Sequence, residues 1–530
     1  MAQVRRALML AGLLAFTAHA SLQAAAPPPA ASEVFYQIFM RSFRDSNGDR
    51  IGDLRGLESE LDYLQRLGVT SLLLTPLQPS PFYHNYFASS FEGIDPAFGT
   101  LADFHSLVRA IHARHMRIYL DEEIQYVTGK HEWLRDSEGN PASRFSHFIP
   151  YNAPGNRDPE AAFLGLHTLA SYDGREIRAA SVNLRDPGVV AYFQRLFTSW
   201  VDPHGDGSLR DGVDGFRIDH MMDDLDGKGK ITGLFAGFWR PVFAAARAVN
   251  PSLRIVAEQY DWGSYGEDWL TRGGVDAVFA FPLRKALVSF DKAKILEAIR
   301  ETERRTPAGK IQVIFIENHD VERFASVVGA SAPREKIGAA FTLLLKGTPL
   351  IYYGQEIGMR GEQSSAFHSD ANDIGVREAF RWTRDLEAPG SAIWYAGDHP
   401  WWTHRFNRTG DGVSVEEETA KPDSLLNFYR RLLRLRAARA ELRTGGQTIL
   451  CASAPSVLCI ERALGNARTL VAINLTADPV TIELSTEDIA AAALNESWQD
   501  LLEHRKVDAR KISLAGFGLR ILGSPPGSRP

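Results

Sequence analysis

Cysteine and excess positive charge are both scarce in this chain, and each shortage excludes a class of protein. Of 530 residues only two are cysteine, Cys451 and Cys459, which is too sparse a set for a cysteine-based metal site. Lys and Arg number 59 against 65 Asp and Glu, a formal net charge of -6. Because nucleic-acid-binding domains usually carry a basic excess, we expect no nucleic-acid partner.

Apolar runs long enough to span a membrane are also missing. One run, Ala7 to Phe16, follows Arg5 and Arg6, but a membrane span needs about 20 apolar residues. Small residues come next, up to Ala26, so residues 1–26 are typical of a secretory signal peptide. No cysteine near this segment could carry a lipid. We expect an exported protein, periplasmic or extracellular, without a membrane anchor.

The two cysteines leave two interpretations open. They flank Ala454-Pro455-Ser456, which is a predicted turn between two strands. In an exported protein a disulfide across such a hairpin is reasonable. Two free, buried thiols are the alternative, and the sequence does not choose between them.

Short apolar runs alternate with amphipathic helical stretches along most of the chain. With 44% hydrophobic and 23% charged residues the composition is that of an ordinary globular protein. Eight strands are predicted, at Val34–Met40, Ser71–Leu74, Ile118–Leu120, Gly215–Ile218, Ile255–Ala257, Ala277–Phe281, Gln312–Ile316 and Pro349–Tyr352. Eight such alternations favour an α/β fold, a (β/α)8 TIM barrel, over its rival, a doubly wound open sheet.

Two departures from the alternation mark further domains. A long polar stretch after the third strand, 122–182, predicts an inserted subdomain, because structureless loops of that length are rare. The barrel then comprises 33–121 and 183–443, and its last helix is predicted over 424–439. Beyond it, 444–530 contains short β runs at 448–451, 457–462, 469–474 and 480–484. This segment predicts a C-terminal antiparallel β-sandwich domain.

Carboxylates follow three of the predicted barrel strands. Asp219, Glu258 and Asp320 each come directly after, or a few residues after, an apolar run. Catalytic residues of β/α barrels lie at these strand ends, and retaining glycoside hydrolysis needs a nucleophilic carboxylate beside a carboxylic acid. Arg217 precedes Asp219 by two residues, so both side chains point to one face of the strand. This pattern indicates a site for carbohydrate cleavage.

These segments and others resemble those of the α-amylase superfamily of glycoside hydrolases. Gly215-Phe216-Arg217-Ile218-Asp219, Val256-Ala257-Glu258 and Ile316-Glu317-Asn318-His319-Asp320 are similar to the three segments that carry its catalytic acids. Tyr36-Gln37-Ile38-Phe39-Met40-Arg41-Ser42-Phe43 resembles its first strand, and the segment 347–356 its eighth. The resemblance extends over about residues 33 to 480.

The resemblance implies a role for each residue of the site. Asp219 is then the nucleophile, Glu258 the general acid/base, and Asp320 the group that binds hydroxyls of the distorted sugar ring. The implied substrate-binding residues are Arg217, His319, Tyr86, His220, Asp121, Gln125 and Tyr126. Tyr86 falls where the family stacks an aromatic ring against the sugar at the cleavage point.

A second predicted site is the loop from Asp45 to Asp53. Its oxygen-bearing residues alternate, as in loops that converge on one calcium ion, and Gly48 permits a tight turn. Members of the superfamily carry a similar loop that binds calcium or magnesium. We expect Ca²⁺ or Mg²⁺ here, held by Asp45, Asn47, Asp49, Asp53 and the carbonyl of Ile51. A metal-free turn is the alternative.

The chain departs from the family pattern beside the cleavage site. After the third strand, Gln125 and Tyr126 stand where the family has Asn-His, and no aspartate precedes Asn183. Together these changes argue against the calcium site that many α-amylases share. Phe87 follows Tyr86 where the family often has an aspartate that holds the end of the sugar in exo-acting members. Its absence favours endo-action or an unusual substrate.

The leading hypothesis is retaining hydrolysis of α-glucosidic bonds, mainly α-1,4, in starch-type glucans or maltooligosaccharides by a monomer. The alternatives are an exo-acting α-glucosidase and an enzyme that transfers the glycosyl unit to another sugar. A non-catalytic, amylase-like binding protein is a remote alternative. Such a protein should lack one of the three acids or contain a membrane helix, and the sequence has neither feature.

Overall fold

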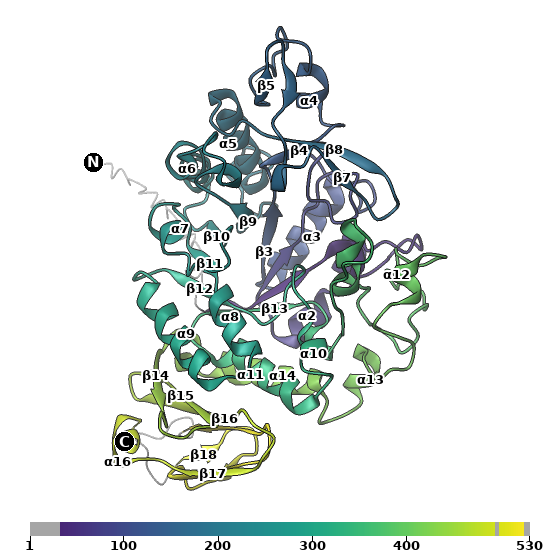
Figure 1. Cartoon of the computed structure of the whole chain (residues 1–530). Helices are drawn as coiled ribbons and strands as arrows, with labels where there is room; N and C mark the ends of the chain where they lie inside the picture. Colours follow the sequence, from purple (N-terminus) through teal and green to yellow (C-terminus); the bar gives the residue numbers. More distant parts are fainter. Residues whose placement is uncertain (1–31, 493–497, 524–530) are drawn as a thin grey trace, which may run out of the picture.

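A closed barrel of eight parallel strands forms the centre of the molecule (Figure 1). The structure is a computed structural model that describes residues 32–492 and 498–523, so the predicted signal segment lies outside the described residues. In chain order the strands are β1 (Phe35–Ile38), β2 (Ser71–Leu74), β3 (Arg117–Glu122), β9 (Gly215–Met221), β10 (Arg254–Gln259), β11 (Ala277–Phe279), β12 (Ile311–Ile314) and β13 (Thr348–Tyr352). β13 pairs with β1, which closes the sheet, confirms the predicted barrel and excludes the open sheet.

Helices between successive strands form the outer ring (Figure 1). They are α1 (Leu54–Ser59), α2 (Leu61–Leu67), α3 (Leu101–Ala113), α5 (Pro187–Val201), the π-helix η5 (Phe235–Trp239) with α6 (Arg240–Val249), α7 (Glu267–Thr271), α8 (Phe281–Val288), α9 (Lys292–Arg305), α10 (Phe324–Val327), α11 (Ala332–Leu344) and α14 (Leu425–Ala438). α1 and α2 meet at Glu60, which ends the first helix and begins the second. In the described part of the chain no helix is long and apolar enough to cross a membrane.

Side-chain alternation in the strands separates the interior of the barrel from its helix-facing surface. In β9, Phe216 and Ile218 belong to the large core shared with the helices. Arg217 between them faces the interior, where Tyr119 and other apolar side chains form a separate cluster. At Gly215 a Cβ atom would lie 2.3 Å from the ring of Tyr119, so this position accepts only glycine. The missing side chain lets β9 approach β3 just below Arg217.

A buried carboxylate joins several strands at the amino end of the barrel. Glu33, just before β1, accepts hydrogen bonds from the hydroxyls of Ser71 at 2.7 Å and Tyr119 at 2.9 Å. It also pairs with Arg117 and, at 3.1 Å, with Arg254. Because these partners come from β2, β3 and β10, one carboxylate connects strands that are distant in the sequence.

The segment after β3 forms a small subdomain above the carboxyl ends of the strands (Figure 1). It contains β4 (Tyr126–Thr128), α4 (Glu132–Ser137), β5 (Tyr151–Ala153), β6 (Arg157–Pro159), β7 (Thr168–Ala170) and β8 (Glu176–Ser181). β4, β8 and β7 make a three-stranded sheet, and β5 pairs with β6.

The connection between β13 and α14 is also long, and the sequence did not mark it. It contains η6 (Gln355–Ile357), η7 (Asp370–Arg377), α12 (Pro400–Thr403) and α13 (Val415–Thr419). Its backbone bonds back to the first β/α loop, where the Phe380 amide donates to the carbonyl of Ser42 at 2.7 Å. The loop after β13 thereby reaches the same end of the barrel as the inserted subdomain.

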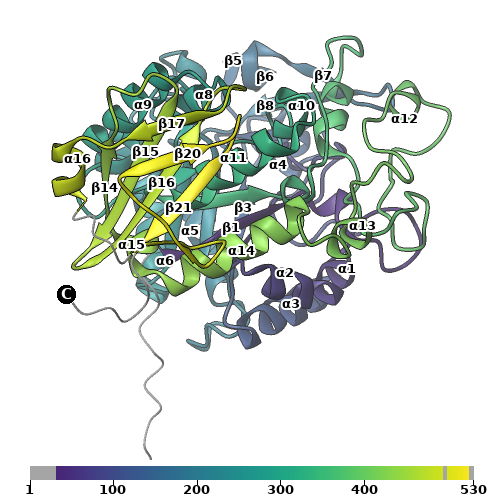
Figure 2. The same ribbon diagram turned by 90° about the horizontal axis from the view of Figure 1, so that it is seen from below.

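After α15 (Ala440–Thr444), a C-terminal domain packs beneath the barrel (Figure 2). Its strands are β14 (Gly446–Leu450), β15 (Val457–Leu464), β16 (Ala467–Asn474), β17 (Val480–Glu483), β18 (Gln499–Asp500), β19 (Arg505–Lys506), β20 (Lys511–Leu514) and β21 (Leu519–Gly523), with α16 (Thr486–Ala491). Six form one antiparallel sheet, and β17 pairs with β20. In β15, Leu458 and Ile460 belong to the core shared with the barrel, whereas Val457 and Cys459 face the two-stranded sheet. This arrangement confirms the predicted antiparallel β domain.

The two cysteines form a disulfide at the end of the β14–β15 hairpin. The bond closes a short loop, and the first residue of α9 holds that loop from the barrel side. The Lys292 ammonium donates to the carbonyls of Cys451 at 2.9 Å and Ala452 at 3.3 Å, and to that of Ala454. Of the two interpretations of the pair, the structure has the bonded one.

We expect Gly215→Ala to destabilise the protein and to lower its activity, because the new methyl group meets the Tyr119 ring. Overpacking of this kind costs about 1–3 kcal/mol of the free energy of unfolding. Gly237→Ala is a matched control, since an added Cβ there has no heavy atom within 4 Å. Thermal unfolding midpoints of the two variants measure the difference. Equal midpoints would show that the barrel tolerates a side chain at Gly215.

Candidate active site

The three acids predicted from the sequence come together at the carboxyl end of the barrel. Asp219 lies in β9 and Glu258 in β10, near the ends of adjacent strands. Asp320 follows β12 in the loop that leads to α10. Asp219 and Asp320 line one cavity. Residues from different strands meet here because parallel strands of a barrel end on one face.

A single guanidinium, that of Arg217, binds three carboxylates. Its Nη1 donates to oxygens of Asp121 and Asp219, each at 2.6 Å, and its Nη2 donates to Glu258. Burial alone would lower the pKa of Arg217, but the charges of Asp121 and Glu258 raise it well above its usual value. The cation therefore stays charged and fixes the relative positions of these acids.

Glu258 has the environment of a general acid. Its side chain is fully buried, and Oε1 accepts a hydrogen bond from the indole N–H of Trp262 at 2.9 Å. Burial raises the pKa of Glu258 to about 7, although Arg217 opposes the shift. A carboxyl with a pKa near neutrality can hold a proton and still release it to a leaving group.

Asp219 and Glu258 lie close enough for a two-step displacement. An oxygen of each carboxylate and a ring nitrogen of His220 lie within 4.8 Å of one another. Retaining glycosidases place their carboxyls about 5–5.5 Å apart, whereas inverting enzymes need about 6.5–9.5 Å to admit a water molecule. The distance between Asp219 and Glu258 therefore fits the retaining arrangement.

A chain of hydrogen bonds joins His319 to the acids. With the Gln37 amide donating to His319 Nδ1 at 3.0 Å, His319 Nε2 carries the proton. That nitrogen lies 2.7 Å from the hydroxyl of Tyr86 and 2.9 Å from Asp320. The Tyr86 hydroxyl in turn donates to Asp121 at 2.7 Å. Its hydroxyl thus fixes the position of Tyr86, and the residue forms part of the cavity wall.

Arg377 is a site residue that sequence reasoning missed. It lies at the end of η7, in the long connection after β13. Its guanidinium donates to Asp320 at 2.9 Å and to the backbone carbonyl of His319 at 2.9 Å. Burial would raise the pKa of Asp320, but His319 and Arg377 outweigh it and hold that pKa below its usual range. No periodicity marks Arg377, so only the fold reveals its partner.

The cavity beside the acids has a volume of about 180 Å³, below the roughly 300–1,000 Å³ of most small-molecule pockets. Its walls are formed by the barrel loops, the subdomain and η7. The lining residues are His84, Tyr86, Phe87, Glu123, Tyr126, Phe163, Asp219, His220, His319, Asp320, Asp373 and Arg377. Sequence reasoning had assigned no role to His84, Glu123, Phe163 or Asp373.

The three substrate-binding residues predicted around the nucleophile have different surroundings. Gln125 is not among the cavity-lining residues: its side-chain amide donates to the backbone carbonyls of Asp219 at 2.8 Å and His220 at 3.2 Å. It therefore orients the end of β9. Tyr126 does line the cavity, but its hydroxyl donates to Asp226. His220 faces the cavity with its ring stacked on Phe163 at 4.9 Å between ring centroids.

The predicted metal loop consists of successive turns closed by side-chain oxygens. Asp45, Asn47 and Asp49 each accept the backbone N–H two residues ahead, at 2.8–2.9 Å. Asp53 accepts the N–H of Ser46 at 2.8 Å and caps α1. The three carboxylates do not form a group within 4.8 Å of one another.

The donor set of this loop nevertheless suits a hard cation. All four side chains offer oxygen, and each keeps at least one oxygen with a free lone pair beyond its turn hydrogen bonds. Among the ion pairs of the described residues none involves Asp45, Asp49 or Asp53. Three carboxylates without a cationic side chain fit a divalent ion.

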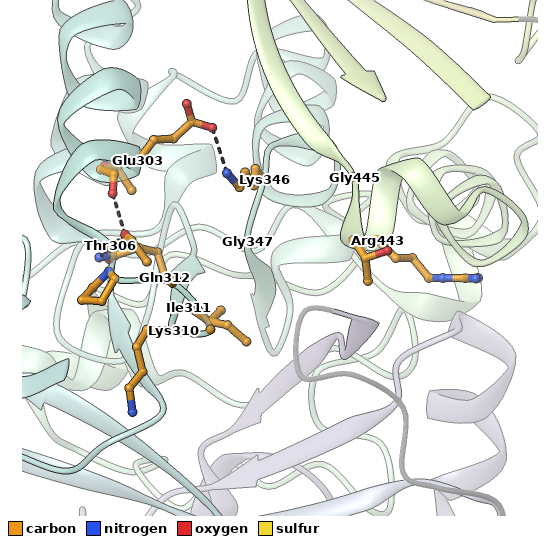
Figure 3. A pocket seen from close by; sticks show the side chains of 14 residues that line it. Glu303, Thr306, Lys310, Ile311, Gln312, Lys346, Gly347, Arg443 and Gly445 are labelled. Carbon is orange, nitrogen blue, oxygen red and sulfur yellow. Dashed lines mark hydrogen bonds and ion pairs between the residues drawn. The ribbon is translucent and has the colours of Figure 1, made fainter. Parts of the chain in front are cut away.

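Another cavity lies at the opposite end of the barrel, near the start of β12 and the turn before β13 (Figure 3). Its charged groups do not converge on a common point. The Lys346 ammonium lies 3.5 Å from Glu303, and Lys310 donates to the backbone carbonyl of Val275 at 2.6 Å. Because barrel active sites lie at the carboxyl ends of the strands, this cavity is not the candidate.

Known proteins with similar sequences and folds include α-amylases and a glucanotransferase, which agrees with the arrangement of the three acids at the end of the barrel. Alpha-amylase 3 of Dictyoglomus thermophilum is 27% identical to this chain over 502 residues, covering 93% of each. The 4-alpha-glucanotransferase of Thermotoga maritima is 27% identical over 438 residues, covering 78% of this chain and 90% of that protein. The crystal structure of the α-amylase from H. orenii superposes with a TM-score of 0.75 at 27% identity, covering 93% of this chain and 99% of that one.

The family model for the alpha amylase catalytic domain matches residues 37–445. The matched region runs from β1 through α15 and contains every acid bound by Arg217, together with Asp320. The chain therefore belongs to the α-amylase family, whose members are glycoside hydrolases or transferases that act on α-glucans.

Proposed function

We propose that this protein hydrolyses α-glucosidic bonds, mainly α-1,4, in starch-type glucans or maltooligosaccharides with retention of configuration. The observation that carries the proposal is the pair Asp219 and Glu258, whose oxygens lie within 4.8 Å and share Arg217. That spacing leaves no room for a water molecule between nucleophile and sugar. It therefore favours a covalent glycosyl-enzyme intermediate.

In the first step the Asp219 carboxylate attacks the anomeric carbon while Glu258 gives its proton to the glycosidic oxygen. Arg217 donates to Asp219 and holds it in line for attack. In the second step Glu258, now a carboxylate, takes a proton from water, which displaces Asp219 from the anomeric carbon. The Trp262 indole N–H holds the other Glu258 oxygen throughout.

Asp320 and its partners bind the sugar rather than react with it. The carboxylate is held by His319 at 2.9 Å and Arg377 at 2.9 Å, so it is ionised and fixed. An ionised, preorganised carboxylate accepts hydrogen bonds from ring hydroxyls, which strengthen as the ring distorts. Tyr86 supplies an aromatic wall beside them.

Exo-action on short substrates and glycosyl transfer are alternatives with the same chemistry. The cavity volume of about 180 Å³ favours short substrates, whereas Phe87, which offers no carboxylate for a chain end, favours internal cleavage. Transfer is favoured by the similarity to a 4-alpha-glucanotransferase. In each case Asp219 forms the same intermediate, and the acceptor decides the product.

A divalent cation, Ca²⁺ or Mg²⁺, is the proposed occupant of the loop from Asp45 to Asp53. Asp45, Asn47, Asp49, Asp53 and the Ile51 carbonyl would hold it. An ion there would offset two of the three negative charges and tie the loop to the start of α1, which Asp53 caps. Its effect would be on stability, because the loop supplies no residue to the cavity.

Export to the periplasm or the medium is proposed on two grounds. The N-terminal segment has the layout of a signal peptide. The disulfide between Cys451 and Cys459 suits an oxidising compartment.

Incubation with starch, maltotriose, isomaltose and sucrose tests the function directly. We expect the α-1,4 substrates to be cleaved fastest and proton NMR of fresh product to show the α-anomer first. Asp219→Asn is the matched control, since it keeps the shape but removes the ionised nucleophile, and should lose on the order of a thousandfold or more. Initial release of the β-anomer would contradict the two-step mechanism.

Activity on maltotriose should fall as pH rises through about 7, because Glu258 then loses the proton that the leaving group needs. Glu258→Gln should lower kcat/KM on maltotriose by about 10²–10⁴-fold. It should lower kcat/KM on α-glucosyl fluoride far less, because fluoride leaves without a proton. Equal losses on both substrates would show that Glu258 is not the acid.

Metal analysis after dialysis should find one divalent ion per chain, and added calcium should raise the thermal midpoint of the stripped protein. At about 100 times its Kd, calcium would contribute about 2.7 kcal/mol. Asp49→Asn should weaken this response. Asp206→Asn, in another exposed turn where the aspartate accepts the Ser208 N–H, should not. A stripped protein whose midpoint ignores calcium would remove the metal site.

A further inference from the structure

A bulge interrupts β9 at the nucleophile. β9 pairs in register with β10 as far as Ile218, and the pairing resumes at Met221. Two residues of β9, Asp219 and His220, therefore oppose the single residue Glu258 of β10. Ile218 and Met221 both belong to the core shared with the helices, whereas strict alternation would place residues three apart on opposite faces. The bulge thus turns both Asp219 and His220 toward the cavity, which both of them line.

The backbone of His220 has a conformation that residues other than glycine rarely adopt. Its φ is 42°, in the left-handed region, and such a residue persists only where its surroundings hold it. The side-chain amide of Gln125 supplies that support, because it donates to the carbonyls of Asp219 at 2.8 Å and His220 at 3.2 Å. Gln125 is one of the two residues that depart from the family pattern after β3. This departure therefore supports the bulge beside the nucleophile.

Three neighbours fix the imidazole ring of His220 in the cavity wall. The ring stacks on that of Phe163, with 4.9 Å between centroids and 13° between planes. Phe163 begins η3 (Phe163–Gly165) of the inserted subdomain. The ring of Tyr260 packs edge to face with it at 6.5 Å, and Nδ1 of His220 lies 3.3 Å from Oδ2 of Asp219. The His220 side chain is 26% exposed, so it is open to a group that enters the cavity.

The two oxygens of Asp219 face different nitrogen groups. Oδ1 accepts a hydrogen bond from Nη1 of Arg217 at 2.6 Å, and that guanidinium is buried inside the barrel. Oδ2 lies on the side of His220, which lines the cavity. Oδ2 is therefore the oxygen that attacks the sugar. Oδ1 becomes the carbonyl oxygen of the resulting ester and stays bonded to Arg217.

The ring nitrogen beside Oδ2 carries a proton whether the ring is neutral or charged, because two lone pairs at this distance would repel each other. Burial alone would lower the pKa of His220. The carboxylates of Asp219, Glu258 and Asp320 outweigh burial and raise that pKa above its usual value, although Arg217 opposes them. These carboxylates favour the imidazolium form, which adds charge to a donor already placed by the geometry.

We propose that His220 is a catalytic residue of the second step, where its Nδ1–H stabilises the negative charge that returns to Oδ2 of Asp219. In that step water forms a bond to the anomeric carbon and gives a proton to Glu258. The bond from the anomeric carbon to Oδ2 breaks, and its electron pair goes to Oδ2. Because Oδ2 carries no charge in the ester, the interaction with His220 strengthens toward the transition state and accelerates hydrolysis of the ester.

The same contact cannot accelerate the first step. There Oδ2 begins as a full carboxylate oxygen and loses its charge as the ester forms, so the interaction with His220 weakens toward the transition state. His220 therefore acts on the nucleophile and not, as the resemblance implies, on the sugar. Phe163 and Gln125 are positioning residues, which act through the ring and the backbone of His220. The inference rests on the proposed function, because it assumes the ester on Asp219.

The test measures the two steps separately on α-glucosyl fluoride and on maltotriose. The value of kcat/KM reports formation of the ester. Mass spectrometry of intact protein, quenched in acid at saturating substrate, gives the fraction of enzyme that carries a glycosyl unit. Dividing kcat by that fraction gives the rate constant for hydrolysis of the ester. Wild type, His220→Ala, His220→Asn, Phe163→Ala and His399→Ala are compared. His399→Ala is the matched control, since His399 also stacks on an aromatic ring, that of Trp401 at 4.7 Å, but does not line the cavity.

We expect His220→Ala to lower the rate constant for hydrolysis of the ester about tenfold or more, while kcat/KM stays within about threefold of wild type or rises. His220→Asn should lose less, because its amide N–H replaces the Nδ1–H without the charge. Phe163→Ala should change the same rate constant in the same direction by a smaller factor. His399→Ala should behave as wild type.

Two results would overturn the inference. One is an unchanged rate constant for hydrolysis of the ester in His220→Ala. The other is a fall of kcat/KM by the same factor as that rate constant, which would mark a role in binding the sugar or in folding. If the thermal midpoint shows that His220→Ala does not fold, the same two readouts on His220→Asn decide. A wild type that cleaves neither substrate would instead overturn the proposed function, and this inference with it.

Discussion

The structure around the cavity depends on one buried cation shared among three carboxylates. Arg217 is 1% exposed at its side chain and donates to Asp121, Asp219 and Glu258. Removing a buried charge costs about 3–5 kcal/mol because its partners stay unpaired, so this group is held as a unit. Asp219 and Glu258 differ within it: Asp219 also faces His220, whereas Glu258 is fully buried against Trp262 with its pKa raised to about 7.

The barrel makes this arrangement possible by bringing strand ends to one face. Gly215 lets β9 approach the ring of Tyr119, and two residues further on Arg217 points into the barrel at the level of Asp121. The acids are therefore placed by strand register, which is rigid. The walls of the cavity come from loops and the inserted subdomain, which can vary without disturbing the acids.

The segment after β3, where Gln125 and Tyr126 replace the residues usual in the family, uses its polar side chains for bonds within the protein. Gln125 and Tyr126 are both polar, and from the sequence either could have contacted the sugar. The structure commits the amide of Gln125 to the carbonyls of β9 and the proton of Tyr126 to Asp226. Glu123, which no motif marks, also lies in the cavity wall.

The eight strands, the barrel class and the candidate acids could be predicted from the sequence alone, because hydrophobic periodicity and the two-residue spacing on a strand are local properties. Which side chains meet could be seen only in the folded protein. Arg377 reaches Asp320 from a connection without periodicity, and the cysteine pair is bonded because β14 and β15 bring the two residues together. Contacts between distant segments depend on strand order and loop paths, and hydrogen-bond direction depends on the actual partner. The spacing of residues along the chain therefore predicts neither the contacts between distant segments nor the direction of a hydrogen bond.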